Sequence, residues 1–179
     1  MSIHRLNHAV LYVRNVERSA SFYRDVLGFA AIGDLVSLRG AAFLRAPGST
    51  NDHDLGLFEI GESAAASPAG RSSVGLYHLA WEVDTLDDLT ELSGRLADAG
   101  ALVGASDHGT TKSLYGHDPD GLEFEIAWIV PADRLDEVAL SGRSHIGPLD
   151  LDGEIARYGA HTPGGIGISR LAPAPAGPS

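Results

Sequence analysis

The sequence contains no cysteine and one methionine, and only 7% of its 179 residues are aromatic. A chain without cysteine has neither disulfides nor thiolate metal ligands, which fits a reducing compartment, so we expect a cytoplasmic protein. Basic residues are also scarce, with 13 Lys and Arg against 24 Asp and Glu and a formal net charge of −11. That charge disfavours nucleic acid and anionic membranes as partners. The chain also lacks an apolar run of membrane-spanning length and a secretion signal, so no membrane partner is expected.

What the chain does have is an internal repeat. His8, in an apolar segment, is followed 51 positions later by Glu59 in the tripeptide Phe-Glu-Ile, and His78 is followed 47 positions later by Glu125 in the same tripeptide. A histidine near the start of each half and a carboxylate near its end predict a duplicated unit with a shared metal site.

The periodicity of apolar residues predicts the order β-α-β-β-β in each half. Asn15 and Thr85 are the expected helix caps, and Gly28 and Gly100 the expected helix stops. The expected elements are strands at 5–13, 30–32, 35–38, 41–45 and 54–60 with a helix at 16–27, then strands at 74–83, 102–105, 113–115 and 123–128 with a helix at 86–99. The fold class is therefore α+β, with two βαβββ modules pairing into a curved mixed sheet around a metal-containing cavity.

Composition divides the chain into a first module (1–60), a Gly/Ala/Ser/Pro-rich linker (61–73), a second module (74–130) and a C-terminal extension (131–179). Within the extension, residues 133–139 and 152–158 are candidate short helices. The Gly/Pro/Ala-rich end from residue 164 is expected to be flexible.

His8, His78 and Glu125 together offer two imidazoles and one carboxylate. This ligand set leaves several coordination positions open, as non-haem Fe(II) oxygenases require. A single strand histidine is more often a hydrogen-bonded core residue, but two at equivalent positions with an aligned carboxylate favour a metal.

Glu59 leaves a second ligand set open. The tripeptide match gives it the repeat position of Glu125, so a site of two histidines and two glutamates is possible. Such a site would suit Ni(II), Zn(II) or Co(II) acting as a Lewis acid. A strand-end carboxylate that faces solvent or pairs with a base is an equal alternative for Glu59.

Several segments resemble the vicinal oxygen chelate superfamily, which includes glyoxalase I, fosfomycin-resistance proteins and extradiol dioxygenases. They are the first helix and turn (Ser21 to Phe29), the second metal strand (Gly75 to Ala80) and the turn Asp118-Pro119-Asp120-Gly121 before Glu125. The resemblance covers about residues 4 to 130. Within the superfamily, the segments 51–57 and 104–115 are most similar to small catechol 2,3-dioxygenase-like proteins.

That closer resemblance implies three catalytic residues, His53, His108 and Tyr115. Strand alternation would place His53 on one face with Leu55, Leu57 and Glu59, facing the cavity. A neutral histidine there would take a proton from a catechol hydroxyl and later return it. His108 and Tyr115 would stabilise charge on oxygen atoms. Leu122, where an asparagine is common, is a departure that leaves the substrate open.

The resemblance therefore implies an Fe(II)-dependent extradiol dioxygenase that cleaves a catechol-type aromatic with O₂, in a homo-oligomer. Other divalent metals (Mn, Ni, Zn) remain alternatives to iron. A glyoxalase-type lyase or isomerase with Glu59 as fourth ligand is the alternative activity. A non-catalytic ligand-binding protein of the same fold is the third hypothesis, and the complete triad argues against it.

Overall fold

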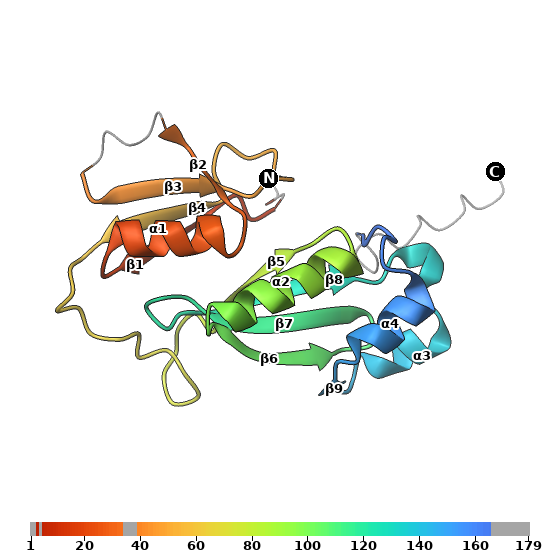
Figure 1. Cartoon of the computed structure of the whole chain (residues 1–179). Helices are drawn as coiled ribbons and strands as arrows, with labels where there is room; N and C mark the ends of the chain where they lie inside the picture. Colours follow the sequence, from red (N-terminus) through yellow and green to blue (C-terminus); the bar gives the residue numbers. More distant parts are fainter. Residues whose placement is uncertain (1–2, 4, 34–38, 166–179) are drawn as a thin grey trace, which may run out of the picture. The chain divides into compact units, whose positions relative to one another are not determined.

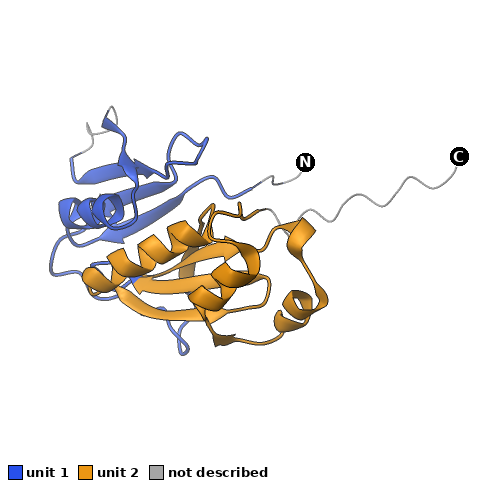
Figure 2. Ribbon diagram, turned by 45° about the vertical axis from the view of Figure 1, so that its right-hand side comes forward, with its two compact units in different colours: residues 1–77, 117–122 blue, residues 78–116, 123–179 orange. Residues whose placement is uncertain are grey.

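The computed structural model describes residue 3, residues 5–33 and residues 39–165. These residues form two compact units, coloured separately in Figure 2. The first consists of Met1–Tyr77 and His117–Leu122, and the second of His78–Gly116 and Glu123–Ser179. The strand expected at 35–38 and the end of the expected flexible tail, from residue 166 on, lie outside the described residues.

The first unit is a four-stranded sheet with one helix on one face (Figure 1). Its elements are β1 (Ala9–Val13), α1 (Val16–Asp25), β2 (Ala30–Ala31), β3 (Ala41–Arg45) and β4 (Leu55–Glu59), and the strand order is β1-β4-β3-β2. β1 and β4 are parallel, whereas β3 is antiparallel to both β4 and β2. Leu11, Leu55 and Leu57 are buried, whereas Val10 and Tyr12 on β1 are exposed, so by strand alternation the leucines lie on the face that packs against α1.

The second unit repeats this arrangement. It contains β5 (His78–Glu82), α2 (Leu86–Asp98), β6 (Leu102–Asp107), β7 (Thr111–His117) and β8 (Glu123–Ile129), in the order β5-β8-β7-β6. β5 and β8 are parallel, as β1 and β4 are. The predicted duplication is confirmed in the connection and order of the strands.

Both predicted helix caps are present. The Asn15 side chain accepts a hydrogen bond from Arg18 N at 2.9 Å. Thr85 and Asp88 form a reciprocal capping box, which satisfies two backbone N–H groups at the start of α2. Gly28 and Gly100 follow the helices with positive φ angles of 81° and 65°, a conformation that favours glycine.

The described part of the C-terminal extension, residues 131–165, belongs to the second unit. It comprises the 3-10 helix η2 (Ala132–Arg134), α3 (Glu137–Gly142), β9 (Gly147–Pro148) and α4 (Leu151–Tyr158). β9 pairs with β6 and extends the sheet to five strands. α4 lies beside α2 over the same face of the sheet (Figures 1 and 2).

The α+β class is confirmed, because the described residues form two mixed sheets covered by helices, neither of which closes into a barrel. The pairing of the two modules around a cavity stays a prediction. None of the helices in the described ranges has the length and apolar composition needed to cross a bilayer.

Candidate metal centre

The second unit brings His78 and Glu125 together. Phe124 and Ile126 on β8 are buried beneath α2, so alternation turns Glu125 to the opposite face of the sheet. His78 lies on that face of the neighbouring strand, because Glu125 is paired with Ala80 in the parallel ladder. The His78 Nε2 and Glu125 Oε2 atoms are 3.1 Å apart, and their side chains are 24% and 13% exposed.

The other oxygen of Glu125 is held by β7. Ser113 Oγ donates to Glu125 Oε1 at 2.5 Å, and the Tyr115 hydroxyl lies 3.5 Å from the same atom. His108 Nε2 is 2.8 Å from the Tyr115 hydroxyl. Four of the predicted site residues, His78, Glu125, His108 and Tyr115, therefore form one hydrogen-bonded cluster within the second unit.

Ser113 was missed by the sequence analysis. It is fully buried and lies two positions before Tyr115 on the same strand, so both side chains point to the same face. Applying alternation backwards from Tyr115 would have found it.

The first unit brings His8 and His53 together. Their ring centroids are 4.5 Å apart, and the His53 ring also contacts Phe43 at 5.1 Å. His53 Nδ1 lies 3.0 Å from Asp52 Oδ2, and His8 Nδ1 lies 2.7 Å from Asn7 Oδ1. In the tautomer in which each Nδ1 donates to these oxygens, each Nε2 has its lone pair directed away from them, where it could bind a metal or a proton.

The expected placement of His53 by strand alternation is wrong. β4 begins at Leu55, so His53 precedes the strand, and Leu55 and Leu57 are fully buried beneath α1 rather than facing a cavity. His8 likewise lies one residue before β1. The face of the first sheet that α1 leaves uncovered carries Phe43, Gly56 and Val10.

Asp54 fixes the loop before β4. Its buried carboxylate accepts hydrogen bonds from Ala46 N, Ser49 Oγ and Asn51 Nδ2 at 2.7–2.8 Å. Burial alone would raise the pKa of Asp54, but these hydrogen bonds prevail and lower it below its ordinary value. Because His53 directly precedes Asp54 in the chain, these hydrogen bonds also restrict the position of the His53 backbone.

The repeat position assigned to Glu59 is also wrong. Leu11 pairs with Leu57 in the first ladder, and Ala80 pairs with Glu125 in the second. Val10 lies two residues after His8, as Ala80 lies two residues after His78, so Val10 is the equivalent of Ala80. The ladder partner of Val10 is Gly56. Glu59 lies three positions further on, where its Oε2 accepts a hydrogen bond from Val16 N at 3.0 Å. The repeat position of Glu125 in the first unit is thus a glycine.

The turn before β8 is held within the first unit. Asp120 Oδ1 accepts from Arg14 Nη1 at 3.1 Å and from Arg18 Nη2 at 2.7 Å, and Tyr23 donates to Asp118 at 3.2 Å. Burial, followed by the proximity of Asp118, raises the pKa of Tyr23 well above its ordinary value, so its hydroxyl stays protonated as a donor.

The donor set fits a divalent metal. Two ligand atoms that are each about 2.1 Å from one ion at about a right angle lie about 3 Å apart, close to the 3.1 Å between His78 Nε2 and Glu125 Oε2. The third predicted ligand, His8, belongs to the first unit. Within the described residues no group of three His, Asp or Glu side chains is gathered as a metal site, so the complete triad stays a prediction.

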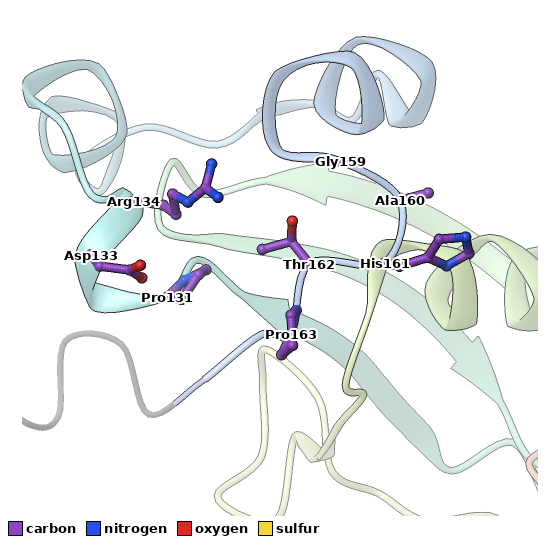
Figure 3. A pocket seen from close by; sticks show the side chains of 8 residues that line it. All are labelled: Pro131, Asp133, Arg134, Gly159, Ala160, His161, Thr162 and Pro163. Atoms are coloured by element: carbon purple, nitrogen blue, oxygen red, sulfur yellow. The ribbon is translucent and has the colours of Figure 1, made fainter.

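Two surface hollows lie away from these side chains. The larger, about 620 Å³, lies beside η2 and the segment that follows α4 (Figure 3). Its lining consists of Pro131, Asp133, Arg134, Gly159, Ala160, His161, Thr162 and Pro163. The other, about 410 Å³, is in the first unit and is lined partly by Val10, Tyr12 and residues 64–68. Neither lining includes a predicted site residue.

Comparison with known proteins agrees with this arrangement. Residues 5–126 match the model of the glyoxalase/bleomycin resistance protein/dioxygenase superfamily. The chain belongs to this superfamily. A solved superfamily domain from Frankia sp. EAN1pec is 25% identical, with a TM-score of 0.58 over 70% of this chain and 92% of that one.

Two superfamily relatives differ in activity. Catechol-2,3-dioxygenase of Bacillus subtilis is 36% identical over 128 residues, which are 70% of this chain but 42% of that protein. A lactoylglutathione lyase of Neisseria meningitidis is 32% identical over 127 residues, 68% of this chain and 88% of the relative. The chain thus spans about two-fifths of the length of the dioxygenase that it matches.

Proposed function

We propose that this protein is an extradiol, ring-cleaving dioxygenase that acts on a catechol-type aromatic with O₂ and a divalent metal, preferably Fe(II). The observation that carries the proposal is the hydrogen bond between His108 and Tyr115 beside Glu125. A tyrosine paired with a histidine next to a metal-binding carboxylate suits a reaction in which charge develops on substrate oxygens. The identity to a catechol-2,3-dioxygenase supports the same reaction class.

His8, His78 and Glu125 would hold the metal, through the Nε2 atoms and Oε2. When bound, the metal would supply a Lewis-acidic, redox-active centre with open positions for both catechol oxygens and O₂. Ser113 would keep Glu125 in the ligating orientation, because its hydroxyl occupies Oε1 and leaves Oε2 directed to His78.

His53 would move the proton. Asp52 accepts the hydrogen on Nδ1, so the Nε2 lone pair is available to a catechol hydroxyl. The side chain of His53 is 19% exposed, which leaves it accessible to a substrate. It would take a proton during binding and return it to the ring-opened product.

Tyr115 and His108 would stabilise negative charge. A hydrogen on His108 Nε2 would be donated to the Tyr115 oxygen. The Tyr115 hydroxyl itself donates to Glu125 Oε1 over a long 3.5 Å distance, and Ser113 donates to the same atom at 2.5 Å. A substrate oxygen bound beside Tyr115 would replace Glu125 as the acceptor of the Tyr115 proton.

The lyase alternative has one observation in its favour, since the match covers most of the length of the lactoylglutathione lyase. A four-ligand centre, however, needs a second carboxylate in the first unit. The position equivalent to Glu125 is Gly56, and Glu59 is bound to the start of α1. A three-ligand centre therefore agrees better with this chain.

Substrate assays with matched variants test the proposal. The Fe(II)-loaded protein should convert catechol or a 3-substituted catechol to a yellow ring-fission product, and His53→Ala should lower kcat by about 10²-fold or more while binding metal normally. Formation of lactoylglutathione without ring cleavage would favour the lyase. Tight binding of aromatics with neither activity would indicate a binding protein.

A further inference from the structure

The C-terminal extension packs against the turn that carries His108. The family match ends at residue 126, whereas η2, α3, β9 and α4 follow it. β9 pairs with the end of β6, placing Gly147 opposite Asp107 and Pro148 opposite Ser106. His108 directly follows Asp107 in the chain, so the extension lies directly beside the candidate site.

Lys112 links the extension to this turn. Its side chain is fully buried, and Nζ lies 2.6 Å from Asp107 Oδ1 and 3.0 Å from Glu154 Oε2. Glu154 belongs to α4, and Tyr158 of the same helix places its ring 5.9 Å from Nζ. A buried ammonium group depends on such partners, because removing one leaves a charge without compensation.

Asp107 connects Lys112 to the turn that carries His108. The same oxygen that binds Lys112 accepts a hydrogen bond from Gly109 N at 2.7 Å. The turn is closed by His108 N donating to Thr111 O at 2.9 Å. His108 therefore lies between Asp107 and Gly109, and the Asp107 carboxylate holds the backbone N–H of Gly109.

A second contact from α3 constrains the same turn. Gly109 has a φ of +75°, and a Cβ there would collide with the Ala139 carbonyl oxygen and come within 2.7 Å of Gly142 Cα. A Cβ on Gly142 would likewise lie 2.7 Å from Gly109 Cα. The two backbones meet at a glycine–glycine contact that admits no side chain.

We propose that the extension is a clamp that fixes His108 against Tyr115, with Glu154, Lys112 and Gly142 as positioning residues. The clamp acts at two points: the Glu154–Lys112–Asp107 ion pairs hold the turn from α4, and the Gly109–Gly142 contact holds it from α3. Its role in catalysis rests on the proposed function, whereas its effect on the turn does not.

Hydrogen exchange of the unmodified and variant chains tests the clamp without any activity. In Glu154→Gln, the amides of residues 107–112 should exchange about tenfold faster, and Lys112→Met should have a larger effect. Asp152→Asn is the matched control, since Asp152 is exposed on the same helix and its substitution removes the same charge. Gly142→Ala should also accelerate the exchange, while Ser141→Ala should not. Unchanged exchange in both Glu154→Gln and Gly142→Ala would overturn the clamp.

A double-mutant cycle tests the link to the reaction. Glu154→Gln should lower kcat about tenfold with little change in KM, and this loss should largely vanish in a His108→Ala background. An equal loss in both backgrounds would show that Glu154 does not act through His108. If no ring cleavage is found but the turn loosens, the proposed function fails and the clamp stands.

Discussion

Glu125, a proposed metal ligand, is held in place by its neighbours on both sides. One oxygen faces His78 and the other is occupied by Ser113, so the carboxylate is held by two strands of one sheet. Such outer hydrogen bonds orient a ligand before the metal arrives and raise affinity without touching the metal.

Ser113→Ala therefore tests the orientation of Glu125. The variant removes the 2.5 Å hydrogen bond to Oε1, and metal affinity should fall by about 10- to 100-fold. Competition with a metal-sensitive dye under anaerobic conditions measures it. Ser72→Ala, at an exposed position, serves as the control, and equal affinities of the two variants would show that Ser113 has no such role.

Tyr115→Phe separates catalysis from metal binding. Because the Tyr115 hydroxyl is 3.5 Å from Glu125 Oε1 and Ser113 is closer, metal affinity should change by less than about twofold, whereas kcat should fall by about 10²-fold. Steady-state kinetics and metal titration on the same preparation give both values. Lost affinity with kcat retained per bound metal would contradict the assigned role.

The carboxylate of Asp54 should make stability depend on pH. Its pKa is lowered in the folded chain, so its stabilisation is complete above the unfolded value of about 3.9 and is lost as pH falls through the lower folded value. At pH 7, Asp54→Asn should lower the free energy of unfolding by about 1–3 kcal/mol, because the amide accepts fewer hydrogen bonds than the carboxylate. Urea unfolding between pH 7 and 3 should show a smaller acid-side loss in Asp54→Asn than in the unmodified chain. Parallel pH profiles would contradict this account.

At the scale of elements, the sequence predicted what depends on neighbouring residues. Both helices begin at their predicted caps, because an N-cap is set by residues three positions apart. The sequence did not predict the register of the strands. The repeated Phe-Glu-Ile tripeptide suggested that Glu59 and Glu125 are equivalent, but burial of Leu55 and Leu57 under α1 sets β4 three residues out of that alignment.

Glu59→Gln checks the corrected register. Glutamine can still accept the hydrogen bond from Val16 N, so stability should change by less than about 0.5 kcal/mol and metal affinity by less than about twofold. Glu125→Gln, in contrast, should lose metal binding. A large loss of affinity in Glu59→Gln, measured by the same titration, would restore the four-ligand lyase hypothesis.

The same distinction between local and long-range contacts explains which site residues were found. His108 and Tyr115 lie on one turn and one strand, and the resemblance to a known motif singled out both. The structure brings them together beside Glu125, while their catalytic role stays a prediction. The role of Lys112 depends on Glu154, 42 positions away, in an extension with no motif to align. No local pattern could have indicated that contact.

At the scale of the whole molecule, the predicted site residues divide between the two units. His8 and His53 lie in the first, whereas His78, Glu125, His108 and Tyr115 lie in the second. The duplication thus gives each unit one of the two proposed metal-binding histidines, and only the second unit the proposed carboxylate ligand. Two of the extension's elements, α3 and α4, lie close to the short helices expected at 133–139 and 152–158, and β9 adds a strand to the sheet of the second unit.

The most direct test of the central claim is oxygen uptake by the complete chain after anaerobic loading with Fe(II). On addition of catechol or a 3-substituted catechol, we expect one O₂ consumed per ring cleaved, with a yellow product. Chelation of the metal should abolish uptake, and so should His8→Ala, His78→Ala or Glu125→Gln. Full metal occupancy without oxygen uptake on any catechol of a broad panel would contradict the account.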